Sequence, residues 1–235
     1  MSTYILIHGA WHGGWCWDKV VPLLEAAGHR ALAPDLPGHG QDPTPTAEIT
    51  LQRYVDSVCA LLDSQPEPVV LVGHSMAGAV ITQVGELRPD KIRNLVYLTA
   101  YVLNDGQSIK DLRPPDSLVP KNSLFTPDGR ISTVREDMLK PLFYADCSDE
   151  DVARAKMLLV PQNITALVTP VHTTPGNFGR LPRIYIECQQ DCAISPETQK
   201  KLYTLMPCER VISMHASHSP FISQPQELAR HLLSV

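Results

Sequence analysis

The chain has 235 residues and a formal net charge of −5, with 43% hydrophobic and 19% charged residues. This length is enough for one large α/β domain whose core needs no disulfide or metal ion. The negative charge and the lack of a basic run argue against nucleic acid or an anionic membrane as a partner. Proline outnumbers glycine, 21 to 13, which indicates many stiff loops.

We expect neither a secretory signal nor a membrane-spanning segment in this sequence. The N-terminal stretch lacks the Lys/Arg-led start of a secretory signal. One long stretch without charged side chains, 68–85, contains polar residues such as His74 and Gln83, so we do not expect a transmembrane helix there. Six cysteines in this context indicate reduced thiols, and we expect a cytoplasmic protein.

Short β-rich runs alternate with longer helical patterns along the chain. We expect strands over 4–8, 30–33, 69–73, 95–98, 183–187 and 210–213. Helical patterns cover 15–27, 51–64, 76–87, 197–206 and 226–233. Thr50 and Ser195 are the expected N-caps of the second and fourth helices. This alternation predicts an α/β fold with a mostly parallel sheet of about six strands and helices on both faces.

The alternation is interrupted over 103–181, which holds eight prolines and no convincing buried strand. Helical patterns cover 132–142 and 149–159, the latter with Ser148 as its N-cap. An insertion of this length is too long for a loop, so we expect a small helical cap. The expected organisation is a single domain over 1–235, with a core of 1–102 and 182–235 and a cap of about 103–181.

One motif carries the strongest chemical signal, the segment Gly73-His74-Ser75-Met76-Ala77-Gly78 between an expected strand and an expected helix. A G-x-S-x-G sequence in this context holds its serine on a sharp, strained turn and exposes the hydroxyl at the carboxyl edge of the sheet. Ser75 is therefore the candidate nucleophile. The alternative interpretation is a glycine-rich connection with an idle serine.

A nucleophilic serine needs a base, and the base needs an acid to orient it. His218 follows the last expected strand and is the candidate base, while His215, nearer the strand end, is the alternative. Asp191 follows the fifth expected strand and is the candidate acid. Asp105, beyond the fourth strand, and Asp35, beyond the second, remain alternatives, although Asp35 is more typical of a loop-shaping residue.

The transition state of acyl transfer also needs donors for its oxyanion. The segment His8-Gly9-Ala10 follows the first expected strand, and we expect the backbone N–H groups of Ala10 and Met76 to be these donors. No phosphate-binding glycine loop occurs, and the pair His215-x-x-His218 lacks a second matched pair for zinc. We expect neither a cofactor nor a metal ion.

These segments, together with 35–40 and 184–194, resemble the α/β-hydrolase superfamily. They look most like its compact branch of plant methyl-ester esterases and hydroxynitrile lyases, which also includes bacterial esterases. The resemblance runs nearly end to end and is weakest in the cap. It implies an α/β-hydrolase fold, a catalytic triad of Ser75, Asp191 and His218, and an oxyanion hole at Ala10 and Met76.

Two positions separate the esterases of this branch from the lyases. The lyases place a threonine after the first-strand histidine and a lysine after the catalytic histidine. This sequence has Gly9 and Ser219 there, so both special groups of a lyase are missing. Ester hydrolysis is therefore favoured over cyanohydrin cleavage.

The predicted function is a cofactor-free serine carboxylesterase that hydrolyses small to medium apolar esters through an acyl-enzyme, alone or as a homodimer. The expected substrate pocket includes Gly9, Trp11, Phe125, Phe143 and Ser219. One alternative is another reaction on the same triad: cleavage of a lactone, a C–C bond or a cyanohydrin. The other is a small-molecule receptor built on a hydrolase fold, which a turnover number would distinguish.

Overall fold

A six-stranded sheet forms the centre of the computed structural model, which describes residues 1–235. Its strand order is β2-β1-β3-β4-β8-β9, and every neighbouring pair is parallel. The strands are β1 (Thr3–Ile7), β2 (Arg30–Leu32), β3 (Val69–His74), β4 (Ile92–Leu98), β8 (Arg183–Cys188) and β9 (Arg210–Met214). Because all six run the same way, their carboxyl ends meet at one edge of the sheet.

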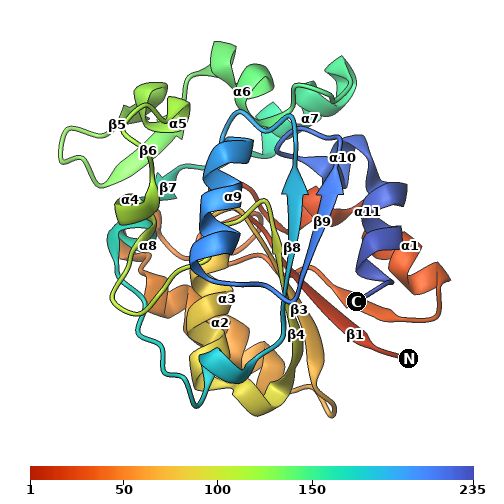
Figure 1. Ribbon diagram of the computed structural model, residues 1–235. Coiled ribbons are helices and arrows are strands. Elements are labelled where there is room, and N and C mark those ends of the chain that lie inside the picture. The colour runs from red at the N-terminus through yellow and green to blue at the C-terminus, as the bar shows by residue number, and fades with distance from the viewer.

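Helices cover both faces of this sheet. The core helices are α1 (Val21–Ala26), α2 (Leu51–Asp63), α3 (Ala77–Leu87), α9 (Pro196–Leu205), α10 (Pro220–Ser223) and α11 (Pro225–Leu232). Short 3-10 turns occupy Gly14–Trp17, Thr46–Glu48, Pro89–Lys91 and Phe178–Arg180. Figure 1 shows α2, α3 and α9 on one side of the sheet and α1 and α11 on the other. None of the helices combines the length and the apolar character needed to cross a bilayer.

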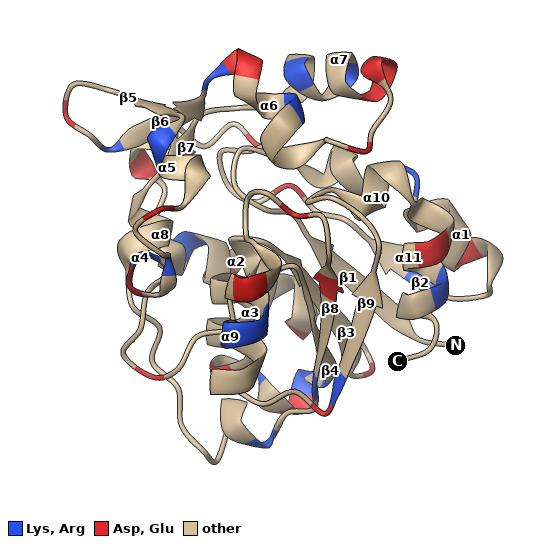
Figure 2. Cartoon of the chain, turned by 45° about the horizontal axis from the view of Figure 1, so that its top comes forward, with Lys and Arg blue, Asp and Glu red and all other residues tan.

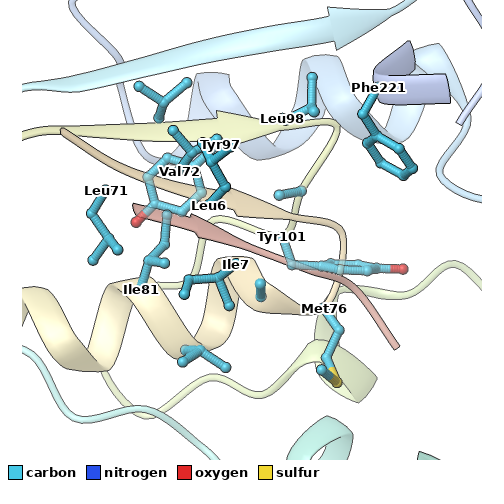
Figure 3. Packing of buried hydrophobic residues seen from close by; sticks show 14 of the residues in the cluster. Leu6, Ile7, Leu71, Val72, Met76, Ile81, Tyr97, Leu98, Tyr101 and Phe221 are labelled. Atoms are coloured by element: carbon cyan, nitrogen blue, oxygen red, sulfur yellow. The ribbon is translucent and has the colours of Figure 1, made fainter. Parts of the chain in front are cut away.

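Two neighbouring inner strands, β1 and β3, are buried along almost their whole length. In β1 and β3, residues 4–7 and 69–74 are buried, as continuous apolar runs covered by helices on both faces require. Figure 3 shows Leu6 and Val72 of these strands in one cluster with Ile81 of α3. Each such side chain contributes about 1.5–3 kcal/mol on burial, so this layer fixes α3 and the turn before it.

The six expected strands are confirmed, with ends shifted by no more than a few residues. The expected N-caps are confirmed as well, since each hydroxyl accepts a backbone N–H three residues on. Thr50 accepts from Arg53 at 3.1 Å, Ser148 from Asp151 at 3.1 Å, and Ser195 from Thr198 at 3.3 Å. Local capping chemistry therefore predicted the starts of α2, α7 (Asp149–Leu158) and α9.

The first expected helix, 15–27, is not continuous. A 3-10 turn covers Gly14–Trp17, and α1 begins only at Val21. Pro22 lies in the first turn of α1 and has no N–H to donate to the carbonyl four residues before it. The helical pattern therefore divides into two short pieces at this proline.

The cap contains helices as expected, and it also contains a small sheet that was not expected. The segment between β4 and β8 contains a three-stranded antiparallel sheet of β5 (Ser123–Phe125), β6 (Ile131–Val134) and β7 (Gln162–Asn163). The expected helix 132–142 is divided between β6 and α6 (Glu136–Phe143), because Ile131, Thr133 and Val134 are β-branched residues that favour a strand. The remaining cap helices are α4 (Ile109–Leu112), α5 (Leu118–Lys121), α7 and α8 (Thr165–Val168). Figure 1 shows most of this segment above the strand ends.

Candidate active site

Ser75 lies on the turn between β3 and α3, in the left-handed backbone region with a φ of 55°. This conformation is strained for a residue with a side chain and persists only where the surroundings hold it. The Ser75 N–H donates to Leu98 O (3.3 Å), and its carbonyl accepts from the N–H groups of Gly78 (3.1 Å) and Tyr101 (3.2 Å). A β-carbon on Gly78 would lie 2.1 Å from Tyr101 O, so the turn needs glycine there.

His218 lies in the loop between β9 and α10, within reach of this serine. Its Nε2 is 3.1 Å from Ser75 Oγ, and its Nδ1 is 2.6 Å from Asp191 Oδ2. The side chains of His218 and Asp191 are only 2% and 0% exposed. Because a carboxylate only accepts hydrogen bonds, Nδ1 carries the proton and Nε2 is free to accept from the Ser75 hydroxyl.

Asp191 follows β8 and is held by four hydrogen-bond donors. Its Oδ1 accepts from the N–H groups of Ala193 (2.6 Å) and Ile194 (2.9 Å). Its Oδ2 accepts from His218 and from the hydroxyl of Thr99, a buried residue directly after β4. The carboxylate orientation is therefore fixed on both oxygens, and the ring of His218 is fixed with it.

The alternative base and acids lie apart from this arrangement. His215 is exposed and accepts from the side-chain amide of Gln190 at 2.9 Å. Asp105 is exposed and accepts from the N–H of Thr173 (3.0 Å). Asp35 accepts from two loop N–H groups, at 2.6 and 2.8 Å, and shapes its own loop as its position indicated. No group of three or more potential metal-ligating side chains occurs in the structure.

Two backbone N–H groups of residues beside the serine have no protein acceptor. Ala10 follows β1 and Met76 precedes α3, and both residues line the same cavity as Ser75. Neither N–H donates to any backbone or side-chain acceptor of the chain. Buried backbone donors are nearly always paired, so two unpaired ones at one cavity indicate a place for a ligand oxygen.

Four further histidines, His8, His12, His39 and His74, are buried around this site. Burial lowers the pKa of His12 to about 4 and holds the pKa values of His8 and His74 well below the usual range. The pKa of His39 is also lowered, again chiefly by burial. All four are therefore neutral near pH 7 and act as hydrogen-bonding groups rather than as charges.

His12 connects the cap to the segment that carries Ala10. Its Nδ1–H donates to Ala10 O (2.8 Å), which leaves Nε2 to accept from the Tyr144 hydroxyl (2.7 Å). Tyr144 ends α6 of the cap and is fully buried, and burial holds the pKa of its hydroxyl well above the usual value. The carbonyl of Ala10 is thus held by a neutral histidine, and the hydroxyl of Tyr144 in the cap holds that histidine in one tautomer.

Trp11, next to Ala10, is held by the cap at three points. Its N–H donates to Gln162 Oε1 (3.3 Å), its indole N–H to Ser132 O (3.0 Å), and its carbonyl accepts from Val160 N (2.9 Å). Its φ of 63° is another left-handed conformation for a bulky residue. The cap strands therefore help to hold the backbone that presents the Ala10 N–H.

Because the pKa values of the four buried histidines are lowered, we expect the protein to lose stability in weak acid. The unfolded chain takes up protons near pH 6.5, whereas the folded chain resists protonation until well below that, about pH 4 for His12. The unfolding free energy therefore falls as the pH drops below about 6.5, by up to about 1.4 kcal/mol per pH unit for each histidine. Urea unfolding at intervals from pH 7.5 to pH 4.5 measures this slope.

Matched variants test whether these histidine side chains cause the dependence of the unfolding free energy on pH. His12→Gln is expected to reduce the pH dependence, even where it lowers stability at pH 7.5. His172→Gln, at a side chain that is 78% exposed, is expected to leave the slope unchanged. Equal stability at pH 7.5 and pH 5 in the unsubstituted protein would contradict the interpretation.

Two adjoining cavities lead to Ser75. The inner cavity, of about 30 Å³, touches Ser75, Ala10 and Met76 and accommodates only a small group. The outer cavity, of about 380 Å³, lies between α4, α8 and the cap sheet. The two share four lining residues: Trp11, Arg113, Val119 and Leu167. A substrate can therefore place a small part beside the serine and a larger part outside.

The structure brings some of the expected pocket residues to these cavities and not others. Trp11 lines both, Phe143 lines the inner one, and Phe125 lines the outer one while remaining 51% exposed. Gly9 and Ser219 line neither of the two. A β-carbon on Gly9 would lie 2.8 Å from the His74 ring, so the threonine of the lyases has no room at this position.

Sequence reasoning missed Thr99, Gln162 and Arg113. Thr99 follows a strand at the same sheet edge as the triad candidates, and that position was its only signal. Gln162 and Arg113 lie in the cap, where no periodic pattern marks a residue as inward-facing.

Comparison with known proteins finds relatives that match this chain over nearly its whole length. The model of the alpha/beta hydrolase family matches residues 4–231. Methylesterase 2 of Arabidopsis thaliana is 34% identical over 99% of this chain and 95% of its own length. A pyrethroid hydrolase of Sphingobium wenxiniae is 33% identical over 97% of this chain and 85% of its own length. The crystal structure of polyneuridine aldehyde esterase superposes with a TM-score of 0.91 at 28% identity, covering 100% of this chain and 98% of that one.

The chain belongs to the alpha/beta hydrolase family. Within the family it lies in the branch of the plant methylesterases, and it is a carboxylic ester hydrolase.

Proposed function

We propose that this esterase works through Ser75 as nucleophile, His218 as general base and acid, and Asp191 as the residue that orients the histidine. One observation carries the proposal. His218 lies between the other two, with Nε2 at 3.1 Å from Ser75 Oγ and Nδ1 at 2.6 Å from Asp191 Oδ2. This is the geometry that proton transfer from a serine hydroxyl needs.

In the first half of the reaction, the ester carbonyl lies beside Ser75 with its oxygen toward the N–H groups of Ala10 and Met76. His218 Nε2 takes the hydroxyl proton as Oγ attacks the carbonyl carbon, and the negative charge develops on the carbonyl oxygen. Asp191 stabilises the imidazolium that forms. The histidine then gives its proton to the departing alcohol oxygen, which leaves an acyl group on Ser75.

In the second half, a water molecule occupies the place of the alcohol. His218 Nε2 accepts a proton from this water as its oxygen attacks the acyl carbon. The same two N–H groups bind the second oxyanion. When that intermediate collapses, the proton returns to Ser75 Oγ and the carboxylic acid is released.

The size and the apolar lining of the cavities favour a small to medium, largely apolar ester as the substrate. Nine of the 11 residues that line the inner cavity are hydrophobic, and the cavity measures only about 30 Å³. A short alcohol such as methanol, or a short acyl group, fits there, while the rest of the substrate occupies the outer cavity. The names methylesterase and pyrethroid hydrolase among the relatives support carboxylic esters of differing bulk.

We also propose that the protein functions in a reducing compartment such as the cytoplasm. All six cysteines are free thiols, and four of them, Cys16, Cys59, Cys147 and Cys188, are buried. Reduced cysteines of this kind are the rule in the cytosol and the exception among secreted proteins.

Covalent labelling tests the assignment of the nucleophile. A p-nitrophenyl alkylphosphonate is expected to inactivate the enzyme and to add one phosphonyl group to the peptide that contains Ser75, as mass spectrometry would show. His218→Gln is expected to slow this labelling by orders of magnitude, because the hydroxyl loses its base. His215→Gln is the matched control and is expected to react at the normal rate. Labelling of another residue, with Ser75 unmodified, would overturn the assignment.

A further inference from the structure

A cationic side chain lies in the wall that the two cavities share. Arg113 lines both the inner cavity beside Ser75 and the larger outer cavity. It directly follows α4, and its backbone is extended, with φ −75° and ψ 125°, because Pro114 disfavours a helical conformation before it. The proline therefore ends α4 at the residue before Arg113 and fixes the backbone that carries the guanidinium.

Arg113 has no anionic partner within the protein, and its guanidinium lies against the hydroxyl of Tyr101, which also lines the inner cavity. Its Nε is buried and makes no hydrogen bond. None of the ion pairs of the chain includes Arg113. The nearest acid in sequence, Asp111, instead accepts from the N–H (2.8 Å) and the hydroxyl (2.6 Å) of Ser108 at the start of α4. A buried guanidinium N–H without an acceptor is unusual and needs an explanation.

The surrounding charge favours an anion. No Asp or Glu lines either cavity, and the outer cavity adds a second cation, the exposed Lys110 of α4. Figure 2 shows both basic and acidic positions around α4, so the preference for an anion rests on the residues that line the cavities. The lining of the outer cavity is otherwise mainly apolar and proline-rich. This combination suits a mainly apolar ligand that carries one negative group.

We infer that Arg113 binds a carboxylate of the ester substrate, at a distance from the ester bond that is cleaved. The inference rests on the proposed function, because it assumes that the ester carbonyl lies at Ser75. The guanidinium presents a planar set of donors that matches a carboxylate, and its buried Nε would gain the acceptor that it lacks. The substrate class is then a half-ester, with one carboxyl group esterified and a second one free.

Matched pairs of anionic and neutral esters measure the preference of the enzyme for a substrate with a free carboxylate. The probes are monomethyl esters of dicarboxylic acids from succinate to suberate, each paired with its dimethyl ester, and acetoxyalkanoates for a carboxylate on the alcohol side. Arg113→Met is expected to lower the ratio of kcat/KM for the anionic ester over the neutral ester by about 10- to 100-fold, mainly through KM. Arg113→Lys is expected to restore part of the ratio, because it keeps the charge but not the planar donors.

A cation of the same segment serves as the control. Lys121 of α5 lines neither cavity and donates to the backbone carbonyl of Asp116. Lys121→Met is expected to leave the ratio unchanged. If Arg113→Met and Lys121→Met have equal effects for every chain length and for both substrate series, the inference is overturned. If neutral esters are still cleaved through Ser75 in that case, the proposed function stands without it.

Binding provides a test that does not depend on turnover. In a Ser75→Ala background, titration calorimetry with the best half-ester is expected to show binding that weakens about 10- to 100-fold on adding Arg113→Met. Unchanged affinity in the double variant would refute the role of Arg113. Conversely, an enzyme that cleaves no ester but binds the half-ester through Arg113 would refute the proposed function and keep the anion site.

Discussion

Replacing Ser75 with alanine is expected to lower kcat for a p-nitrophenyl ester by about 10⁶, by analogy with serine hydrolases that lose their nucleophile. The reason is that no other hydroxyl is placed to accept the acyl group. His218 Nε2 has Ser75 Oγ as its partner at 3.1 Å, and the turn that carries Ser75 is fixed by β4 and α3. The remaining rate would come from substrate binding and the unpaired N–H groups of Ala10 and Met76.

The measurement is steady-state hydrolysis, with circular dichroism to show that the variant is folded. Ser57→Ala is a suitable control, because Ser57 lies on α2 and only donates to the carbonyl of Tyr54 at 2.8 Å. It is expected to keep full activity. A Ser75→Ala protein that retained a tenth of the normal rate would rule out Ser75 as the nucleophile.

Asp191→Asn is expected to lower kcat by about 10⁴ by analogy with triads that lose their acid, although it changes only one atom. The amide oxygen of the asparagine must take the Oδ1 position, because two N–H donors, from Ala193 and Ile194, point at that position. The NH₂ group then faces His218 Nδ1. A donor there forces the histidine into the tautomer whose Nε2 carries the proton, and this tautomer cannot accept the proton of Ser75.

Kinetics and structure together test this prediction. The variant is expected to keep its fold and a nearly normal KM, with the loss confined to kcat. Asp105→Asn, at the exposed alternative acid, is expected to change neither parameter. If Asp105→Asn reduced kcat as strongly as Asp191→Asn, the acid would have been assigned to the wrong strand end.

The parts of this site that follow strands could be predicted from the sequence. Ser75, Asp191 and His218 come after three expected strands, and parallel strands bring their carboxyl ends to one edge. Local signals fixed the rest of the core: the glycines around Ser75 marked the turn, and Thr50 and Ser195 marked helix starts. None of these predictions required knowledge of a contact between distant segments.

The cap could not be predicted in the same way, because its structure depends on distant pairing. Strand β7 consists of only Gln162 and Asn163, too short for any periodic pattern, and it pairs with β6 about 30 residues earlier along the chain. The direction of Arg113 and of Gln162 likewise depends on tertiary contacts rather than on neighbours in sequence. The Nε2 partners of the four buried histidines also lie beyond sequence reasoning, since each comes from a distant part of the chain.

Because the cap holds Trp11, replacing the cap to change the substrate range would also affect the backbone of the oxyanion-binding segment. A cap exchanged with that of a relative would bring new walls for the outer cavity, but it would also replace the groups that hold the backbone beside Ala10. These groups are the side chain of Gln162, the carbonyl of Ser132 and the N–H of Val160. A chimaera that kept them would preserve the oxyanion-binding backbone, and one that lost them would turn over slowly even with all three triad residues in place.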